Sequence, residues 1–401
     1  MNSRRRSVII APGAFKHSLS AASTAAAIER GLRRAGLSSR YDFESIPIAD
    51  GGNGTLEAFL RAEPRLRRVE QVAHDPLMRP VTAAFAADRP IVVEMALASG
   101  LELLRPEEQN PLKTTTYGVG ELLKAALDHW RGGEIIVGMG GSATVDGGAG
   151  CLQALGVRFF DRAGQELPPG LGGGDLHRVQ RIDLSGIDPR WQDVPLVIAA
   201  DVDNPVLGED GAARVFGPQK GANRAQVMLL EASLRHLFTL FAEQHGADVR
   251  MTPGGGAAGG LAAGLMAVLM AVFGGRARLR LQSGVDLILD AARFDERLAN
   301  CALVITGEGR MDAQTVRGKG PIGVARRAAA QGVRTVALVG GLAVDDALLH
   351  EAGMWSVLPI VTAPMSQEDA IRDAEALVER AALRLGYLLQ TLTPRRRASK
   401  D

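Results

Sequence analysis

Hydrophobic and polar positions in the N-terminal part of the chain predict strands that are each followed by a loop and a helix. The apolar run at residues 7–11 predicts a strand, and the segment 21–35, between a serine N-cap and a glycine stop, predicts a helix. A second strand is predicted at 41–48, and it leads through the glycine loop Asp50–Thr55 into another helix. The order strand, loop, helix therefore occurs twice in succession.

The C-terminal part shows the same order. Strands are predicted at 302–306, 335–339 and 356–360, with helices near 323–331 and 345–351 between them. Strands and helices that alternate, joined by short glycine turns, predict a parallel sheet covered by helices on both faces.

The middle of the chain has a more mixed pattern. It predicts helices at 224–244 and 261–273 and short strands at 81–86, 91–94, 134–138, 157–161 and 195–200. We therefore predict an α/β fold of two domains, a doubly wound Rossmann-like parallel-sheet domain interrupted by an inserted second α/β domain. The predicted boundaries assign residues 1–65 and 285–395 to the first domain, 66–284 to the second and 396–401 to a disordered tail.

Composition narrows the class of protein. Of 401 residues 46% are hydrophobic and 23% charged, and the net charge of +1 gives no reason to expect nucleic acid or a membrane surface as a partner. The uncharged segment 254–275 approaches the length of a membrane span, but its first third is glycine and alanine, so we predict a buried core helix. The chain has only two cysteines, which suits a reducing compartment, so we expect a cytoplasmic protein. Its expected partner is a small molecule, and a homodimer stays open.

Compact glycine clusters are the most informative feature for function. Glycine lets backbone N–H groups approach an anion, and a helix that starts just after the cluster adds its dipole. The cluster 138–148 also carries hydroxyl and carboxylate side chains, and its predicted phosphate-binding residues are Gly140, Gly141, Ser142, Thr144 and Asp146. The cluster 254–260 precedes the buried helix and predicts a second anion-binding loop, with contacts from Gly255, Gly256 and Gly259.

Two carboxylates, Asp201 and Asp203, follow the predicted strand 195–200. Mg²⁺ binds through one or two carboxylates together with substrate phosphates, so this pair predicts a metal site. An Asx turn before Pro205 is the alternative interpretation.

Charged residues at two other strand ends suit acceptor binding and proton transfer. Arg310 offers a planar fork for a carboxylate or phosphate, and Glu308 or Asp312 could act on a hydroxyl proton. A surface ion-pair loop is the alternative. Lys16 and Ser18 lie between the first strand and the first helix, where ligands commonly bind in such sheets.

Of two common nucleotide-binding patterns, the sequence lacks one and partly matches the other. There is no Walker A motif, because Arg317–Gly320 lacks both the upstream glycine and the hydroxyl residue after the lysine. The cluster 138–148 begins as G-x-G-x-x-A, and Asp161 ends the next predicted strand, a pattern that is typical of NAD(P)-dependent dehydrogenases.

Taken together, these segments closely resemble the bacterial glycerate kinase family, which makes 2-phosphoglycerate. The matching stretches are 14–21, 49–55, 114–122, 138–150, 201–208, 216–221, 256–264 and 305–323. The resemblance runs from residue 8 to about 360. It implies an ATP-dependent kinase acting on a glycerate-like hydroxyl, on a Rossmann-like domain interrupted by a second α/β domain, and it argues against a dehydrogenase.

Several substitutions depart from the family pattern, among them Val145 in place of a common Asn, and three lie in the loops next to the expected substrate. Gly13 and His17 stand where the family usually has Asp and Gly, and Asn53 stands where it usually has Glu. The loss of two carboxylates suggests an acceptor larger or more anionic than glycerate, with His17 as a hydrogen-bond donor. Neutral variation in a plain glycerate kinase is one alternative, and a sensor that binds ATP and ligand without turnover is another.

Residue type then suggests roles in an active site that we expect in the interdomain cleft. ATP phosphates would bind at the two glycine clusters, with Mg²⁺ at Asp201 and Asp203. The predicted catalytic residues, with Asp50 as first and Glu308 as second choice for the base, are Lys16, Asp50, Glu308 and Lys319. The predicted substrate-binding residues are His17, Ser18, Asn53, Arg310 and Asp312.

Overall fold

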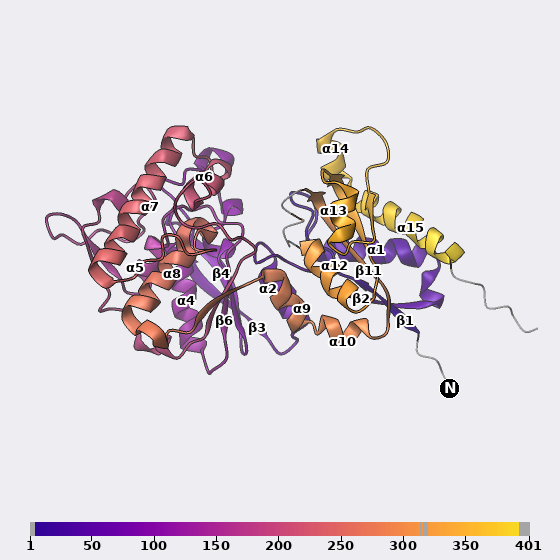
Figure 1. The fold of residues 1–401 in the computed structure, drawn as a ribbon, viewed down its shortest axis with the longest axis horizontal. Coiled ribbons are helices and arrows are strands. Elements are labelled where there is room, and N and C mark those ends of the chain that lie inside the picture. The colour runs from indigo at the N-terminus through magenta and orange to yellow at the C-terminus, as the bar shows by residue number, and fades with distance from the viewer. Residues whose placement is uncertain (1–4, 313–314, 316–319, 393–401) are drawn as a thin grey trace, which may run out of the picture. The chain divides into compact units, whose positions relative to one another are not determined.

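The computed structural model describes residues 5–312, 315 and 320–392. The chain divides into two compact units (Figure 1): unit 1 contains residues 1–50 and 285–401, and unit 2 contains residues 51–284. Each unit has its own sheet with helices packed on it, so the predicted α/β class with two domains is confirmed. The predicted domain boundaries, at residues 65 and 284, stay a prediction.

Unit 1 is built on a fully parallel sheet of strand order β13-β12-β11-β1-β2. Its strands are β1 (Arg6–Ile10), β2 (Tyr41–Ser45), β11 (Cys301–Met311), β12 (Thr335–Leu342) and β13 (Ser356–Pro359). Its helices are α1 (Ala21–Arg34), α9 (Gly284–Ala291), α10 (Phe294–Leu298), α12 (Gly320–Ala330), α13 (Asp346–Glu351), α14 (Gln367–Arg372) and α15 (Ala374–Leu392).

Both faces of this sheet are buried. Val336 and Leu338 of β12 pack in a cluster with α1 and α15, which lie side by side (Figure 1). The alternate residues Ala337 and Val339 pack on the other face with α12 and α13. Successive side chains of a strand point to opposite faces, so this split confirms the doubly wound arrangement.

One strand differs from its prediction. The strand at 302–306 was expected to end in a loop at Gly307–Arg310, but β11 continues to Met311. Glu308 pairs with Val339 and Arg310 with Gly341 of β12, so the glycines lie within the ladder. A Cβ on Gly340 would overlap the carbonyl oxygen of Gly309. Glycine occurs in these strands because their backbones approach too closely for a side chain.

Unit 2 is built on a mixed sheet of strand order β10-β9-β6-β5-β4-β3. The main strands are β3 (Arg67–His74), β4 (Pro80–Ala87), β5 (Ile91–Glu94), β6 (Ile135–Gly138), β9 (Leu196–Ala199) and β10 (Leu279–Gln282). The last four of these strands are parallel, and β3 and β4 are antiparallel additions at one edge. A separate antiparallel pair is formed by β7 (Arg158–Phe160) and β8 (Arg181–Asp183).

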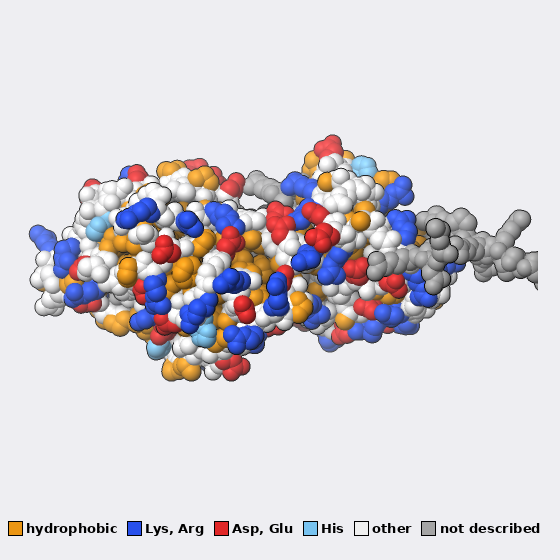
Figure 2. Space-filling view, turned by 90° about the horizontal axis from the view of Figure 1, so that it is seen from below, with side chains coloured by type: hydrophobic (Ala, Val, Ile, Leu, Met, Phe, Trp, Pro, Cys, Tyr) orange, Lys and Arg blue, Asp and Glu red, His pale blue; other side chains and the backbone are white. Residues whose placement is uncertain are grey.

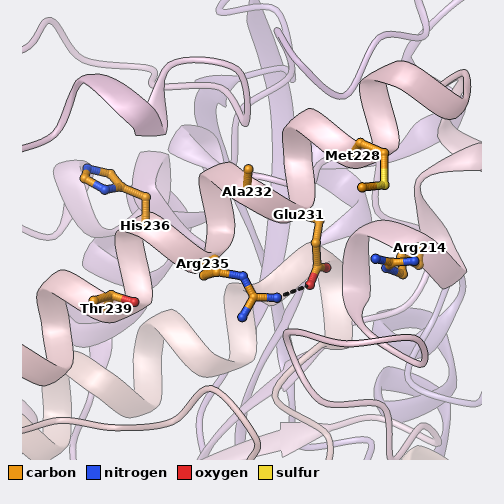
Figure 3. Close-up of a pocket in the computed structure, with 7 residues that line it drawn as sticks. All are labelled: Arg214, Met228, Glu231, Ala232, Arg235, His236 and Thr239. Carbon is orange, nitrogen blue, oxygen red and sulfur yellow. Dashed lines mark hydrogen bonds and ion pairs between the residues drawn. The ribbon is translucent and has the colours of Figure 1, made fainter.

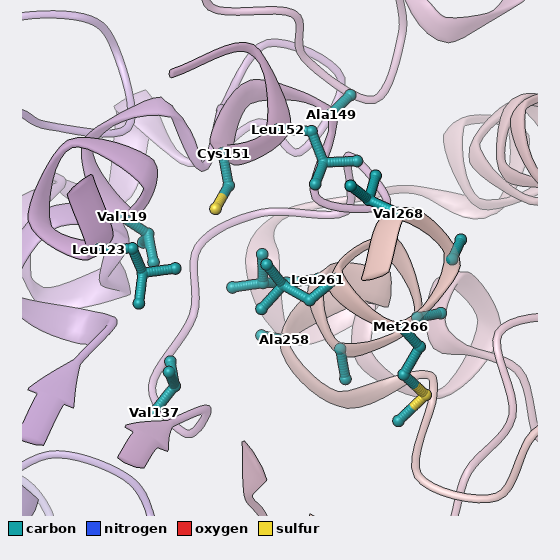
Figure 4. Close-up of a cluster of buried hydrophobic side chains, with 14 of the residues drawn as sticks. Val119, Leu123, Val137, Ala149, Cys151, Leu152, Ala258, Leu261, Met266 and Val268 are labelled. Carbon is teal, nitrogen blue, oxygen red and sulfur yellow. The ribbon is translucent and has the colours of Figure 1, made fainter. Parts of the chain in front are cut away.

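The helices of unit 2 enclose a large apolar core. They are α2 (Thr55–Ala62), α3 (Ala96–Ser99), α4 (Tyr117–His129), α5 (Ala149–Ala154), α6 (Ala212–Phe216), α7 (Arg224–His245) and α8 (Ala257–Phe273). Figure 4 shows side chains of α4, α5, α8 and β6 meeting in one cluster. On the face shown in Figure 2, Lys and Arg side chains are interspersed with Asp and Glu, in keeping with the net charge of +1.

Helix α8 is the apolar segment that the sequence predicted to be a core helix. Ala257–Arg276 is long and apolar enough to cross a membrane by composition, with a mean hydropathy of 2.0, but 78% of it is buried inside the protein. Its first turn is irregular, because Ala258, Gly259 and Gly260 have φ values of 53°, 68° and 93°. The regular helix therefore starts at about the predicted residue, Leu261.

Candidate active site

Two glycine loops lie against each other at the carboxyl ends of β6 and β9 in unit 2: the 51–54 loop and the 138–148 loop. The N–H of Gly140 donates to the carbonyl of Gly51 over 2.8 Å. A Cβ on Gly51 would overlap the carbonyl oxygen of Ala199 at the end of β9. Glycine is required here because backbones touch, and ligands in open α/β sheets bind at such carboxyl ends.

The 51–54 loop is held by a buried carboxylate that the sequence did not single out. Glu94, at the end of β5 and 3% exposed, accepts the N–H of Gly54 over 3.1 Å and that of Leu56 over 2.9 Å. Burial raises the pKa of Glu94, and these two hydrogen bonds oppose the rise. Asn53 is exposed at the tip of this loop, and its Oδ1 lies over Gly141.

The tip of the 138–148 loop is open to solvent, whereas its base is not. Gly141 is exposed and Gly140 half-buried, but Thr144 and Asp146 are fully buried. The Asp146 carboxylate accepts hydrogen bonds from the hydroxyl of Thr116 at 2.7 Å and from four backbone or side-chain donors in all. Of the predicted ATP-binding residues in this loop, those at the tip are thus accessible to a ligand. Asp146, in contrast, holds the loop together from inside.

A lysine is buried beneath the same loop. Lys220 is 3% exposed, and its Nζ donates to Ser142 Oγ at 2.6 Å and to the carbonyl of Thr144 at 2.7 Å. Burial lowers the pKa of Lys220 to about 7, although the charge of Asp146 opposes this. Lys220 lies in a stretch that resembles the family, 216–221, but its residue type and spacing gave no signal that it reaches Ser142.

The second glycine cluster packs on the first. The N–H of Gly147 donates to the carbonyl of Gly259 over 3.0 Å, and a Cβ on Gly259 would overlap the carbonyl oxygen of Thr144. Gly255 and Gly256 are buried as well, and Gly256 donates its N–H to the carbonyl of Asn204 over 2.9 Å. Close packing accounts for these three glycines, and their prediction as ATP-binding residues stays a prediction.

The two predicted metal ligands follow β9 directly, next to these loops. Asp203 is exposed and Asp201 half-buried. Among the residues that the structure describes, no group of three or more His, Cys, Asp or Glu gathers into a site that could hold a metal. A pair of carboxylates still suits Mg²⁺, which takes its other ligands from phosphates and water.

In unit 1, the loop after β1 forms a tight turn that presents the predicted lysine. Phe15 and Leu19 exchange two backbone hydrogen bonds of 2.9 Å, and the hydroxyl of Ser18 donates to the carbonyl of Phe15 over 3.0 Å. Lys16 and His17 are exposed at the tip, and His17 has a left-handed φ of 66°. That φ suits glycine, the residue usual in the family at this position.

Glu308 stands out electrostatically at the carboxyl end of this sheet. Burial raises its pKa to about 7; a hydrogen bond of 2.8 Å from Thr315 Oγ1 lowers it, as does the charge of Lys16, whereas the charges of Asp50 and Asp312 raise it. Three residues predicted to be catalytic, Lys16, Asp50 and Glu308, are therefore close enough for their charges to interact. A carboxylate poised near pH 7 is suited to general-base work.

The remaining predicted residues of unit 1 are less well fixed. Arg310 is 73% exposed, and its Nε lies 3.9 Å from Asp312 Oδ2, a distance at which an exposed pair contributes little. The side chain of Arg310 is thus available to a ligand. Lys319 lies outside the residues that the structure describes.

The dinucleotide-binding pattern does not form a dinucleotide-binding unit. That unit needs the strand after the glycine loop to be parallel and in the same sheet. Here β7, which precedes Asp161, pairs with β8 in a separate antiparallel sheet, and the parallel neighbours of β6 are β5 and β9.

One surface pocket of unit 2 is lined by none of the predicted site residues. It has a volume of about 420 Å³ and is lined by α6 and α7, from Arg214 to Thr239 (Figure 3). Three of its polar side chains already contact protein groups, because Arg235 pairs with Glu231 at 2.9 Å and His236 contacts the carbonyl of Val179. We therefore locate the candidate site at the loops and not at this pocket.

Comparison with known proteins identifies the chain's relatives. The model of the glycerate kinase family matches residues 8–390. A glycerate kinase of Halalkalibacterium halodurans is 46% identical over 94% of this chain and 96% of its own length. The glycerate 2-kinase of Escherichia coli is 41% identical over 95% of this chain and 97% of its own length.

A solved structure is similar across the same range. A crystal structure from Salmonella typhimurium assigned to glycerate kinase 2 superposes with a TM-score of 0.78 at 39% identity, covering 97% of this chain and 99% of that one. The sequence motifs, the two α/β units and the relatives agree with one another over nearly the full length. The chain belongs to the glycerate kinase family.

Proposed function

We propose that the protein transfers the γ-phosphoryl group of Mg²⁺-ATP to a hydroxyl group of D-glycerate or of a closely related 2-hydroxy acid. Membership of the family makes the chain an ATP-dependent kinase whose acceptor is a hydroxyl group. The observation that carries the acceptor chemistry is Glu308, a carboxylate with a pKa of about 7 beside Lys16 and Asp50.

In this proposal Glu308 is the base, ahead of Asp50. The acceptor hydroxyl gives its proton to a Glu308 oxygen, its oxygen bonds to the γ-phosphorus, and the bond from that phosphorus to the bridging oxygen of ADP breaks. Lys16, with Lys319 in the same role, stabilises charge on the transferring group, and Arg310 binds the acceptor carboxylate with Ser18 and Asp312 nearby.

The loops of unit 2 take the nucleotide in this proposal. The loop tip, with exposed Gly141 and half-buried Gly140, and the hydroxyl of Ser142 meet the phosphates, while Thr144 and Asp146 hold the loop from inside. Mg²⁺ would be held by Asp201 and Asp203 and would neutralise phosphate charge. Because acceptor and nucleotide must meet, we propose that the active site lies in a cleft between the two domains, as predicted.

The three departures from the family pattern bear on the acceptor. Gly13 has no left-handed φ and a Cβ there would make only ordinary contact, so the usual Asp would fit. Asn53 lies beside Gly141 in unit 2, whereas Gly13 and His17 belong to the turn in unit 1. We propose that the lost carboxylates favour an acceptor more anionic or larger than glycerate.

A coupled ADP-release assay with Mg²⁺-ATP and a panel of small hydroxy acids tests this function. Strong turnover on D-glycerate would make the three departures neutral, and better turnover on another acid would support altered specificity. The triple variant G13D/H17G/N53E should then shift preference back toward glycerate. ATP binding without turnover on any acceptor would overturn the kinase proposal in favour of the sensor.

The cell location and assembly follow from the same proposal. A kinase that uses cellular ATP works in the cytoplasm, and the apolar helix α8 is mostly buried as in a core. We propose a cytoplasmic enzyme without nucleic-acid or membrane partners, and sedimentation of the purified protein would test for a homodimer.

A further inference from the structure

The buried lysine beneath the 138–148 loop is not part of the chemistry described above. Lys220 comes at the end of a short turn that follows α6, fixed by the backbone hydrogen bond from its N–H to the carbonyl of Gly217 at 3.0 Å. The next residue, Gly221, has a left-handed φ of 93°, and a Cβ there would overlap the carbonyl oxygen of Gln109. The turn is therefore rigid, and it aims one long side chain at the loop.

The contacts of Lys220 are unusual for a buried cation. The interactions shown for its Nζ are two hydrogen bonds to neutral oxygens, those of Ser142 and Thr144, with no direct carboxylate contact among the described residues. The hydroxyl Oγ1 of Thr144 beside it is buried and makes no hydrogen bond within the described part of the chain. A buried polar cluster that is only partly compensated is costly, so it calls for an explanation.

The hydrogen bond to Ser142 has a direction. When Lys220 is charged, its ammonium group has donors only, so Ser142 Oγ accepts from it and the hydroxyl hydrogen of Ser142 points elsewhere. Ser142 follows directly after the exposed Gly141 at the loop tip. Ser142 itself is only 9% exposed, and no acceptor for its hydroxyl hydrogen is found among the described residues, so this hydrogen can donate to an anion bound at the tip.

We propose that Lys220 is a positioning residue that fixes the Ser142 hydroxyl as a hydrogen-bond donor to a nucleotide phosphate. It also places its positive charge under the loop, where a bound phosphate would compensate it. This inference rests on the proposed kinase function, because it concerns the nucleotide side of the same reaction. Lys220 itself does not touch the nucleotide.

The test compares ATP affinity in K220M, S142A, S142T and the double variant S142A/K220M, with K124M, an exposed lysine on α4, as the matched control. We expect K220M and S142A each to raise KM for ATP about tenfold, with KM for the acceptor unchanged, as for the loss of a hydrogen bond to a charged group. The double variant should be no worse than the single ones, and S142T should stay near wild type.

Several outcomes would overturn the proposal. Unchanged KM for ATP in folded K220M would do so, as would effects that multiply in the double variant. If K220M fails to fold, the comparison of S142A with S142T tests the proposal instead. Equal ATP affinity in these two variants would then contradict it. Binding of a non-hydrolysable ATP analogue, measured by calorimetry, compares the same variants even if the wild type turns over no acceptor, so failure of the kinase function is distinguishable.

Discussion

At the scale of single residues, the site depends on groups held in unfavourable states. Glu308 is a carboxylate whose burial holds its pKa near 7, and His17 is a non-glycine residue with a left-handed φ. Each has a cost in stability that a simple substitution would remove. Such costs are typical of functional sites, where geometry is selected for chemistry.

Changing Glu308 to Gln should separate its two effects. We expect kcat to fall by about 10²–10⁴-fold, because a positioned base is lost. In the wild type, kcat/KM should rise with pH through about 7, as Glu308 releases its proton, and reach a plateau above it. The variant D50N is the control: if it removes this pH dependence and E308Q does not, then Asp50 is the base.

The same variant should be more stable at high pH. The folded-state pKa of Glu308 lies above its ordinary value, so the folded protein holds a proton between pH 4.5 and about 7 that the unfolded chain has released. The free energy of unfolding therefore falls as pH rises through this window. E308Q has no proton to release in this window, so its free energy of unfolding at pH 8 should exceed that of the wild type by ~2 kcal/mol, after allowance for solvent screening. Urea titrations measure this difference, and equal free energies of unfolding would contradict the prediction.

Substitution of His17 by Gly should relieve backbone strain. We expect H17G to raise the free energy of unfolding by about 0.5–1 kcal/mol, since glycine adopts a left-handed φ without steric cost. The variant H17A keeps the Cβ and should gain nothing, so the difference isolates the backbone effect. If the imidazole binds the acceptor, both variants should raise the acceptor KM equally, and unchanged KM in both would contradict that role.

At the scale of elements, the loops are positioned by backbone packing on α8. Gly264, one turn into the regular part of α8, faces the 138–148 loop, and a Cβ on it would overlap the carbonyl oxygen of Gly147. Gly147 has a left-handed φ of 62°. The helix thus supports the predicted nucleotide loop through contacts that only glycine permits.

Gly264→Ala should therefore weaken both the fold and ATP binding. We expect a loss of roughly 1–3 kcal/mol in unfolding free energy, as for overpacking of a dense core, together with a higher KM for ATP. Gly275→Ala is the matched control, because a Cβ there meets nothing within 4 Å. Both quantities follow from urea titration and steady-state kinetics, and wild-type values for G264A would refute the packing argument.

The sequence predicted strands and helices where burial produces a recognisable pattern of apolar residues. The strand at 335–339 is buried in a parallel sheet, so it appears as an apolar run, and the strand near 356–360 is half-buried at the edge of the same sheet. The sequence did not predict the end of β11, because glycines usually indicate a loop. Here they allow the backbones of two paired strands to approach closely. Glu94 and Lys220 could not be found, because their partners are groups brought close only by the tertiary fold.

At the scale of the whole molecule, the two units have separate cores. The largest cluster of buried side chains in the described part of the chain contains residues from Ala73 to Phe273 and so belongs wholly to unit 2. In unit 1, one cluster combines residues near the N-terminus with residues after 300, and another contains only residues after 310. Unit 2 is therefore continuous in sequence, whereas unit 1 needs both ends of the chain.

Residues 51–284 should accordingly fold without the rest of the chain. We expect this fragment to unfold cooperatively in urea and to give a dispersed amide spectrum in NMR, because its main cluster of buried side chains lies wholly within it. The full-length protein provides the reference transition. A fragment with native secondary structure but no fixed side-chain signals would show that unit 2 needs unit 1.

The pairing of β1 has a consequence for synthesis on the ribosome. β1 lies between β2 and β11, and its Ser7 pairs with Cys301. At ~5–20 residues per second, one edge of β1 waits roughly 15–60 s for its partner, while all of unit 2 is made and can fold. A ribosome that stalls before Cys301 releases a chain with an open strand edge, a substrate for chaperones and for aggregation.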